Sequence, residues 1–180
     1  MTTLHPNAEK LIALVQDFLS EVSDLTPGQP LETHLNTHYP PTSPFYQDLR
    51  ALILSGLTEG WVATSALDGP KYRRSILHPP SPATRYFSIT TVYMDSEGDD
   101  AYRGQYHLHP YGEINCVVPV DEGAQIRGMN GWMGAGWTAP APGTHHYPEV
   151  RGGRLVAVFF LPAGRISYKA HPGMEQPVVV

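Results

Sequence analysis

From Trp61 onward, short runs alternate apolar and polar side chains, and this period of two constrains the fold more than any other feature. Clusters of Gly, Pro, Asp or Ser separate the runs, as turns separate strands. Spacing of this kind is typical of a sandwich or small barrel, so we expect a mostly β fold over residues 61–180. The runs are YRRSIL (72–77), RYFSITTVYM (85–94), YRGQYHLH (102–109), INCVVPV (114–120), GWTAPA (136–141) and RLVAVFFLPAGRISY (154–168).

Residues 1–60 have a helical period instead, and we expect them to pack on the β structure as an N-terminal helical segment. From Asn7, the expected N-cap, apolar side chains recur every three or four residues and predict an amphipathic helix. A second helix begins after Ser43, its expected N-cap, and ends at Gly60. Four prolines interrupt residues 24–41, so a connector with at most one short helical turn is expected there.

Length and charge narrow the classes of partner. The chain has 180 residues, enough for one core, and a net charge of −5 without a basic block, so we expect a small-molecule partner and no nucleic acid. Cys116 is the only cysteine, which excludes an internal disulfide. The sequence has no signal-peptide pattern and no membrane-spanning apolar run, and we expect a cytoplasmic protein.

The two ends of the chain raise the question of a second subunit. We expect a homodimer, in which the helical segment either packs on its own barrel or contacts the partner. The final segment HPGMEQPVVV (171–180) is either a tail or an edge strand that completes a sheet, in its own chain or in a second copy.

The segment GQYHLHPYGEINCVVP (104–119) carries the most informative side chains. On a strand, residues two apart face the same way, so His107 and His109 converge. The turn at residues 110–112 returns Glu113 toward them, which makes a set of two histidines and one carboxylate. The histidine pair alone is a weak signal, because paired histidines are more often surface or hydrogen-bonded core residues than ligands.

A fourth ligand is available from the later segment PGTHH (142–146). A hairpin there brings back either His145 or His146, and the spacing Gly-x-x-His favours His146. Together the two segments predict one divalent metal ion. The alternative is a barrel that has these residues without using a metal.

The segments HLHPYGE and PGTHH resemble the two motifs of the cupin superfamily, a small β-barrel that holds a metal inside. This resemblance implies His107, His109, Glu113 and His146 as ligands, a set that accepts Fe, Mn, Zn, Co or Ni. The chain departs from the cupin pattern at two turn positions, where the pattern has glycine and this sequence has Ala101 and Val120.

A more specific resemblance covers almost the whole chain. It rests on the helical leader and on GWVATSALDGPKYRRSIL, FSITTVYMDS, RGQYHLHPYGEIN, GWTAPAPGTHHYPEVRGG and FFLPAGRISY, which are similar to the 4-hydroxylaminobenzoate lyase family. The resemblance implies conversion of 4-hydroxylaminobenzoate to 3,4-dihydroxybenzoate (protocatechuate) and ammonia in nitroaromatic degradation.

An aromatic acid needs a cation for its carboxylate, and a guanidinium fits one best. The candidates are Arg73, Arg74, Arg85 and Arg103; of the adjacent pair at most one can point inward. Strand parity gives Arg103 and Gln105 the same face as His107, and gives Asn115 and Val117 the same face as Glu113, while Cys116 faces the other way. We therefore add Gln105 and Asn115 as groups that face the substrate. For proton transfer the candidates are Glu113, His145 and Glu149.

Two other functions stay open on the sequence. The same histidines and glutamate could serve a cupin dioxygenase acting on a small aromatic compound, which oxygen consumption would reveal. A barrel that binds a small ligand without catalysis is the other, because one fold hosts many functions.

Overall fold

The computed structural model describes residues 4–98 and 100–178, and it begins with helices α1 (Pro6–Val22), α2 (Gln29–His38) and α3 (Pro44–Glu59). The ends of α3 are as predicted. The Ser43 side chain accepts a hydrogen bond from the N–H of Tyr46, and Gly60 has a left-handed φ of 78°. Within the described residues, no helix combines the length and the apolarity needed to cross a bilayer.

Helix α2 shows that the prediction of a mere connector was wrong. Pro30 lies in the first turn of α2, where a helix needs no N–H donor, so this proline starts the helix. The predicted N-cap of α1 was also wrong. His5 caps this helix by accepting a hydrogen bond from the N–H of Asn7, while the Asn7 side chain binds the carboxylate of Glu59.

The capping interaction at Ser43 gives a stability prediction. Replacing Ser43 with alanine should lower the free energy of unfolding by about 1 kcal/mol, because an N–H of the first turn of α3 loses its acceptor. Ser43→Gly should cost only a few tenths of a kcal/mol at this position. Urea unfolding followed by circular dichroism measures both, and equal losses for the two variants would contradict a capping role.

The β structure that follows forms three sheets, in which neighbouring strands are antiparallel. A six-stranded sheet has the order β1 (Ser65–Asp68), β2 (Tyr72–His78), β3 (Phe87–Asp95), β12 (Arg154–Pro162), β6 (Ile114–Pro119) and β9 (Gly136–Thr138). A four-stranded sheet has the order β4 (Tyr102–Arg103), β11 (Glu149–Arg151), β7 (Gln125–Gly128) and β8 (Gly131–Met133). The third sheet is the pair β10 (His145–His146) and β5 (His107–Leu108).

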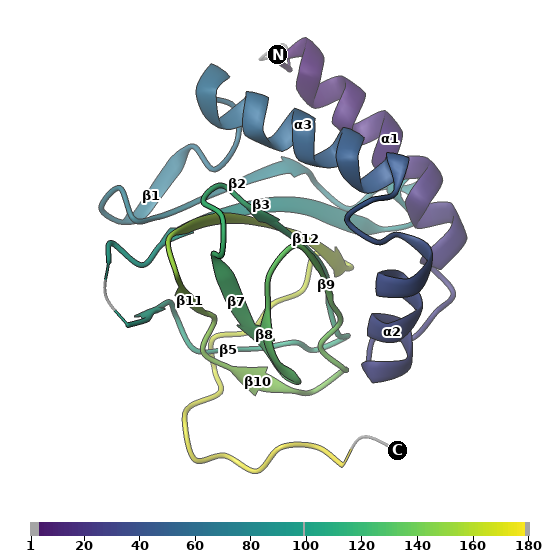
Figure 1. The fold of residues 1–180 in the computed structure, drawn as a ribbon. Coiled ribbons are helices and arrows are strands. Elements are labelled where there is room, and N and C mark those ends of the chain that lie inside the picture. Colours follow the sequence, from purple (N-terminus) through teal and green to yellow (C-terminus); the bar gives the residue numbers. More distant parts are fainter. Residues whose placement is uncertain (1–3, 99, 179–180) are drawn as a thin grey trace.

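The six-stranded sheet has an apolar layer on each face. Helices α1 and α3 lie across its outer face, and α2 lies beside β9 (Figure 1). Central strand β12 supplies both layers: Val156, Val158 and Phe160 pack with the helices, while Leu155, Ala157, Phe159 and Leu161 pack with residues of the four-stranded sheet. The sheets therefore enclose an interior of their own, and the prediction of a mostly β fold preceded by helices is confirmed.

The segment YRGQYHLH was predicted as one strand, but the structure divides it into β4 and β5, separated by residues 104–106. The cause is a close approach of the chain to a neighbouring segment. A Cβ at Gly104 would lie 2.9 Å from Cγ of Pro148, and the Gly104 N–H bonds to the Pro148 carbonyl. The strand parity that we carried from His107 back to Arg103 is therefore lost at this break.

The runs GWTAPA and RLVAVFFLPAGRISY also give shorter strands than predicted. Strand β9 ends at Thr138, shortly before Pro140, and β12 ends at Pro162. A proline lacks the N–H that continues a ladder, and Ala163 and Gly164 then turn with φ of 52° and 62°. Strands β1, β7, β8, β10 and β11 lie outside the predicted runs, because each has only two to four residues.

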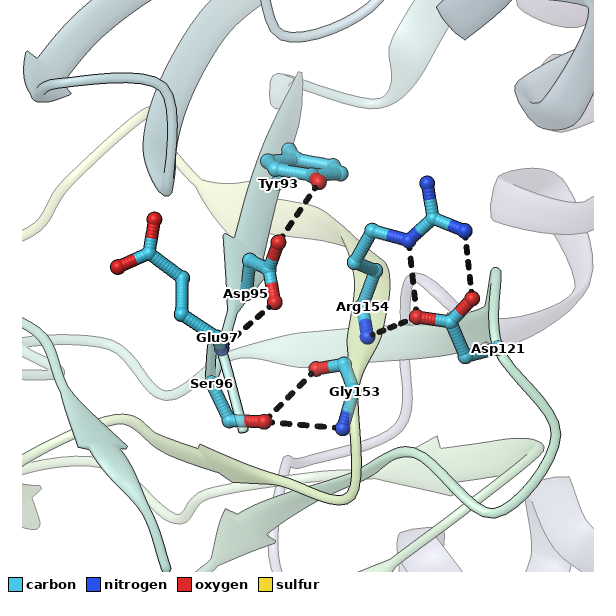
Figure 2. A network of polar contacts seen from close by, with 7 residues as sticks. All are labelled: Tyr93, Asp95, Ser96, Glu97, Asp121, Gly153 and Arg154. Atoms are coloured by element: carbon cyan, nitrogen blue, oxygen red, sulfur yellow. Dashed lines mark hydrogen bonds and ion pairs between the residues drawn. The ribbon is translucent and has the colours of Figure 1, made fainter. Parts of the chain in front are cut away.

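Polar contacts fasten the loops at one end of β12, opposite the end that pairs with Ile114 (Figure 2). The Arg154 guanidinium donates to both carboxylate oxygens of Asp121, at 2.8 and 2.6 Å. The Ser96 hydroxyl accepts from the N–H of Gly153 at 2.9 Å. The ion pair between Arg154 and Asp121 is exposed and contributes little to stability, but together the two contacts fix where β12 begins.

Candidate metal centre and its cavity

Three histidine side chains converge in the interior between the sheets. His107 lies on β5 and pairs across to His146 on β10, while His109 follows β5 directly. Each offers a ring nitrogen, and these nitrogens all lie within 4.8 Å of one another. The spacing of the ligating atoms suits one metal ion between them.

Hydrogen bonds orient two of these rings and set their tautomers. Nδ1 of His107 donates to the backbone carbonyl of Gln105 at 3.0 Å. Nδ1 of His109 donates to the Thr144 hydroxyl at 3.0 Å, since that hydroxyl gives its own proton to the carbonyl of Ala141. Such partners at the outer nitrogen are typical of metal-binding histidines.

The tautomers of His107 and His109 leave two nitrogen lone pairs facing each other. Because both Nδ1 atoms carry the proton, the Nε2 atoms of His107 and His109 are both acceptors, and they lie 3.1 Å apart. Two acceptors at this distance repel unless a cation or a proton lies between them. The residues present therefore fit a divalent metal.

Burial keeps the three imidazoles neutral, as metal ligands must be. Burial lowers the pKa of His107 to about 4, and burial with the nearby His107 and His146 lowers the pKa of His109. Burial also lowers the pKa of His146 to about 3, with further lowering from His107, Arg127 and His145. A neutral ring needs no deprotonation before it binds a metal.

Glu113 lies next to His109, but its carboxylate is not among the atoms that all lie within 4.8 Å of one another. Its Oε2 is 4.0 Å from Nε2 of His109 and has no hydrogen-bond partner among the described residues, although Glu113 is buried. Burial raises the pKa of Glu113 to about 8. An unpartnered buried carboxyl oxygen is costly, and a cation beside His109 would remove that cost.

His145 and Glu149, two candidates for proton transfer, point to other partners. His145 is turned from the histidine group, with its Nδ1 2.6 Å from the hydroxyl of Tyr106. Glu149 pairs with Arg103 and Arg127, at 2.8 and 2.9 Å. Burial acts to raise the pKa of Glu149, but the two guanidinium hydrogen bonds outweigh it, and the pKa is lowered overall. Catalytic roles for His145 and Glu149 stay predictions.

A cavity of about 260 Å³ adjoins the histidine group and reaches His107. Its wall is largely apolar, and Arg74 supplies the positive charge. Nη1 of Arg74 lies 2.9 Å from the hydroxyl of Tyr168, whose ring is edge-on to His107 with centroids 6.5 Å apart. The apolar lining comprises Tyr72, Ile76, Val92, Met94, Phe159, Leu161 and Ile166.

The other three candidate arginines lie outside this cavity. Arg73 points to the opposite face of β2 and lies over the ring of Tyr93, 4.3 Å from its centroid. Arg85 is exposed at a turn, with φ of 50°. Arg103 is largely exposed and pairs with Glu149. Of the adjacent pair, the structure places Arg74 alone in the cavity wall.

The two amide candidates are in different environments. Gln105 is exposed, and its backbone carbonyl rather than its side chain contacts the histidine group. Asn115 is buried and donates to the hydroxyl of Thr138 at 3.2 Å, while its Oδ1 has no hydrogen-bond partner in the described part of the chain. Substrate contacts by either amide stay predictions.

The sequence reasoning did not select Thr144 or Tyr168. Thr144 orients His109, and its place inside the PGTHH segment was a usable signal. Tyr168 enters the cavity because Ser167 exchanges both backbone hydrogen bonds with Leu108, at 2.7 and 3.0 Å, a pairing that no local pattern reveals. Cys116 is buried against the helices, and burial raises the pKa of its thiol, which disfavours the thiolate that a nucleophile needs.

Comparison with known proteins places this site in a family. Residues 13–168 match the family model PnbB, described as 4-hydroxylaminobenzoate lyase. The chain belongs to the 4-hydroxylaminobenzoate lyase family. A lyase of this name from Pseudomonas putida is 54% identical over 166 residues, which cover 89% of this chain and 94% of the relative. Another from Nocardioides sp. (strain LMS-CY) is 55% identical over 158 residues, which cover 88% and 92%.

Solved structures of DMSP lyases share much less sequence with this chain than its relatives in the 4-hydroxylaminobenzoate lyase family do. A chain from crystal structures of the DMSP lyases RdDddP and RnDddQII has a TM-score of 0.43 and 16% identity, over 91% of this chain and 98% of that one. The DMSP lyase DddQ from Ruegeria pomeroyi DSS-3 has a TM-score of 0.41 and 15% identity, over 94% and 99%.

Proposed function

We propose that this protein converts 4-hydroxylaminobenzoate to 3,4-dihydroxybenzoate and ammonia. The observation that carries the proposal is the cavity itself, where Arg74 and His107, one member of the histidine group, border one largely apolar space. Membership of the 4-hydroxylaminobenzoate lyase family supports this substrate.

The reaction balances with water as the second reactant. The N–O bond of the hydroxylamino group breaks, a C–O bond forms at the ring carbon ortho to nitrogen, and water replaces nitrogen at its carbon. The products are one catechol and one ammonia. No external oxidant is needed, since the N–O bond is reduced as the ring is oxidised.

The cavity residues would bind and orient the substrate. The Arg74 guanidinium suits the carboxylate, and the Tyr168 hydroxyl beside it can donate a second hydrogen bond. The apolar lining takes the aromatic ring and excludes bulk water from it. His107 lines the same cavity, so a substrate held there would lie beside the histidine group.

His107, His109, His146 and Glu113 would hold the metal ion, with nitrogen and oxygen ligands of the kind that Fe, Mn, Zn, Co and Ni accept. A divalent metal held by these residues would supply Lewis acidity toward a departing hydroxyl. Thr144 and the Gln105 carbonyl hold the rings of His109 and His107 in position for it.

An anaerobic assay tests the proposal. The purified protein, with its metal content measured, is given 4-hydroxylaminobenzoate without oxygen, and both products are quantified. We expect 3,4-dihydroxybenzoate and ammonia in equal amounts. Turnover that requires oxygen would instead indicate a dioxygenase, and tight binding of the compound without products would indicate a binding protein.

We further infer a cytoplasmic homodimer. A free, buried Cys116 suits a reducing compartment. Strand β1 lies at the edge of the six-stranded sheet, and the exposed Leu67 and Ile76 nearby offer apolar surface to a second copy.

A further inference from the structure

The C-terminal segment, residues 169–178, forms a strap beside the candidate metal centre. It leaves the β structure near β5, turns at residues 172–173 and runs past β10 (Figure 1). Pro177 packs over the turn that precedes β10, where a Cβ at Gly143 would lie 3.4 Å from its ring. The strap therefore covers the hairpin that carries His146.

The side-chain amide of Gln176 takes the place of a neighbouring strand for β10. Its Oε1 accepts a hydrogen bond from the N–H of His145 at 3.2 Å, and its Nε2 donates to the carbonyl of the same residue at 2.6 Å. Strand β10 has two residues and pairs on its other side only with β5, in the part of the chain that the structure describes. The Gln176 side chain thus satisfies both backbone hydrogen-bonding groups of His145 at the open edge of β10.

The imidazole of His145 is also held from the outside. Its Nε2 donates to the backbone carbonyl of Glu175 at 3.1 Å, so its Nδ1 accepts from the hydroxyl of Tyr106 at 2.6 Å. Successive side chains on a strand point to opposite faces. Holding His145 outward therefore turns the next residue, His146, inward.

We propose that Gln176 is a positioning residue, which holds β10 so that the ring of His146 faces His107 and His109. The inference rests on the metal site of the proposed function, but not on the identity of the substrate. A strand this short has few contacts of its own, and the strap supplies the contacts on its outer edge.

Cobalt binding tests the proposal without any substrate. Co²⁺ affinity is measured by competition with a chromogenic chelator, and the visible spectrum of the bound ion reports its ligand geometry. Gln176→Ala should weaken Co²⁺ binding about ten-fold and alter the spectrum, because loss of an outer partner loosens a ligand. Gln176→Glu should behave in the same way, since an isosteric carboxylate cannot donate to the His145 carbonyl.

Glu175→Ala is the matched control, because the side chain of Glu175 is exposed and only its backbone carbonyl contacts His145. This variant should bind Co²⁺ like the wild type. His107→Ala gives the background of binding outside the histidine group. Wild-type affinity and spectrum in folded Gln176→Ala, or in Gln176→Glu, would overturn the positioning role. If wild-type protein binds Co²⁺ at the histidine group but does not turn over 4-hydroxylaminobenzoate, the proposed function fails and the positioning test still stands.

Discussion

His109→Ala is expected to lose the bound metal and to lower kcat/KM for 4-hydroxylaminobenzoate by about a thousand-fold, since Lewis acidity is worth several kcal/mol in the transition state. His109 is the central residue of the histidine group. Its Nε2 lies 3.1 Å from that of His107 and 4.0 Å from Oε2 of Glu113. The substitution therefore removes the side chain that lies between the other histidines and the carboxylate.

Metal content by mass spectrometry and product formation under anaerobic conditions check this expectation together. His38→Ala is the control, because His38 is exposed on α2 and should leave both quantities unchanged. Circular dichroism confirms that each variant is folded. A folded, metal-free His109→Ala protein that turns over substrate at the wild-type rate would show that the histidine group does not serve this reaction.

The histidine group was predictable because its information is local. His107 and His109 are two apart, and a tight turn returns the chain at Glu113, so short-range geometry brings them together. The choice of His146 over His145 depended on spacing within one hairpin. The structure explains that choice through the strap, which holds His145 outward by contacts more than 25 residues away in sequence.

Predictions that needed long-range contacts were less successful. Strand parity failed for Arg103, because Gly104 passes close to Pro148 and interrupts the strand at a point that no local pattern marks. Parity succeeded for the uninterrupted strand β6, where Cys116 faces the helices and Val117 faces the interior. The choice among four arginines could not be made from the sequence, because it depends on which face of β2 borders the cavity.

The position of Arg74 in the cavity wall predicts the second large effect on catalysis. Arg74→Ala should lower kcat/KM for 4-hydroxylaminobenzoate by about ten- to a hundred-fold, because a hydrogen bond to a charged group contributes about 1.5–3 kcal/mol. Most of the change should appear in KM, since the carboxylate keeps its charge throughout the reaction and Arg74 binds it equally before and during catalysis. Steady-state kinetics at constant metal content measure the two parameters separately.

The adjacent Arg73 provides a matched control on the same strand. It contacts Tyr93 on the other face of β2, so Arg73→Ala should leave KM unchanged even where it lowers stability. Benzoate and benzamide, compared as competitive inhibitors, isolate the charge. The wild type should bind benzoate more tightly, and Arg74→Ala should bind the two equally. If Arg73→Ala raised KM while Arg74→Ala did not, the carboxylate would lie outside this cavity, and the substrate orientation proposed here would be wrong.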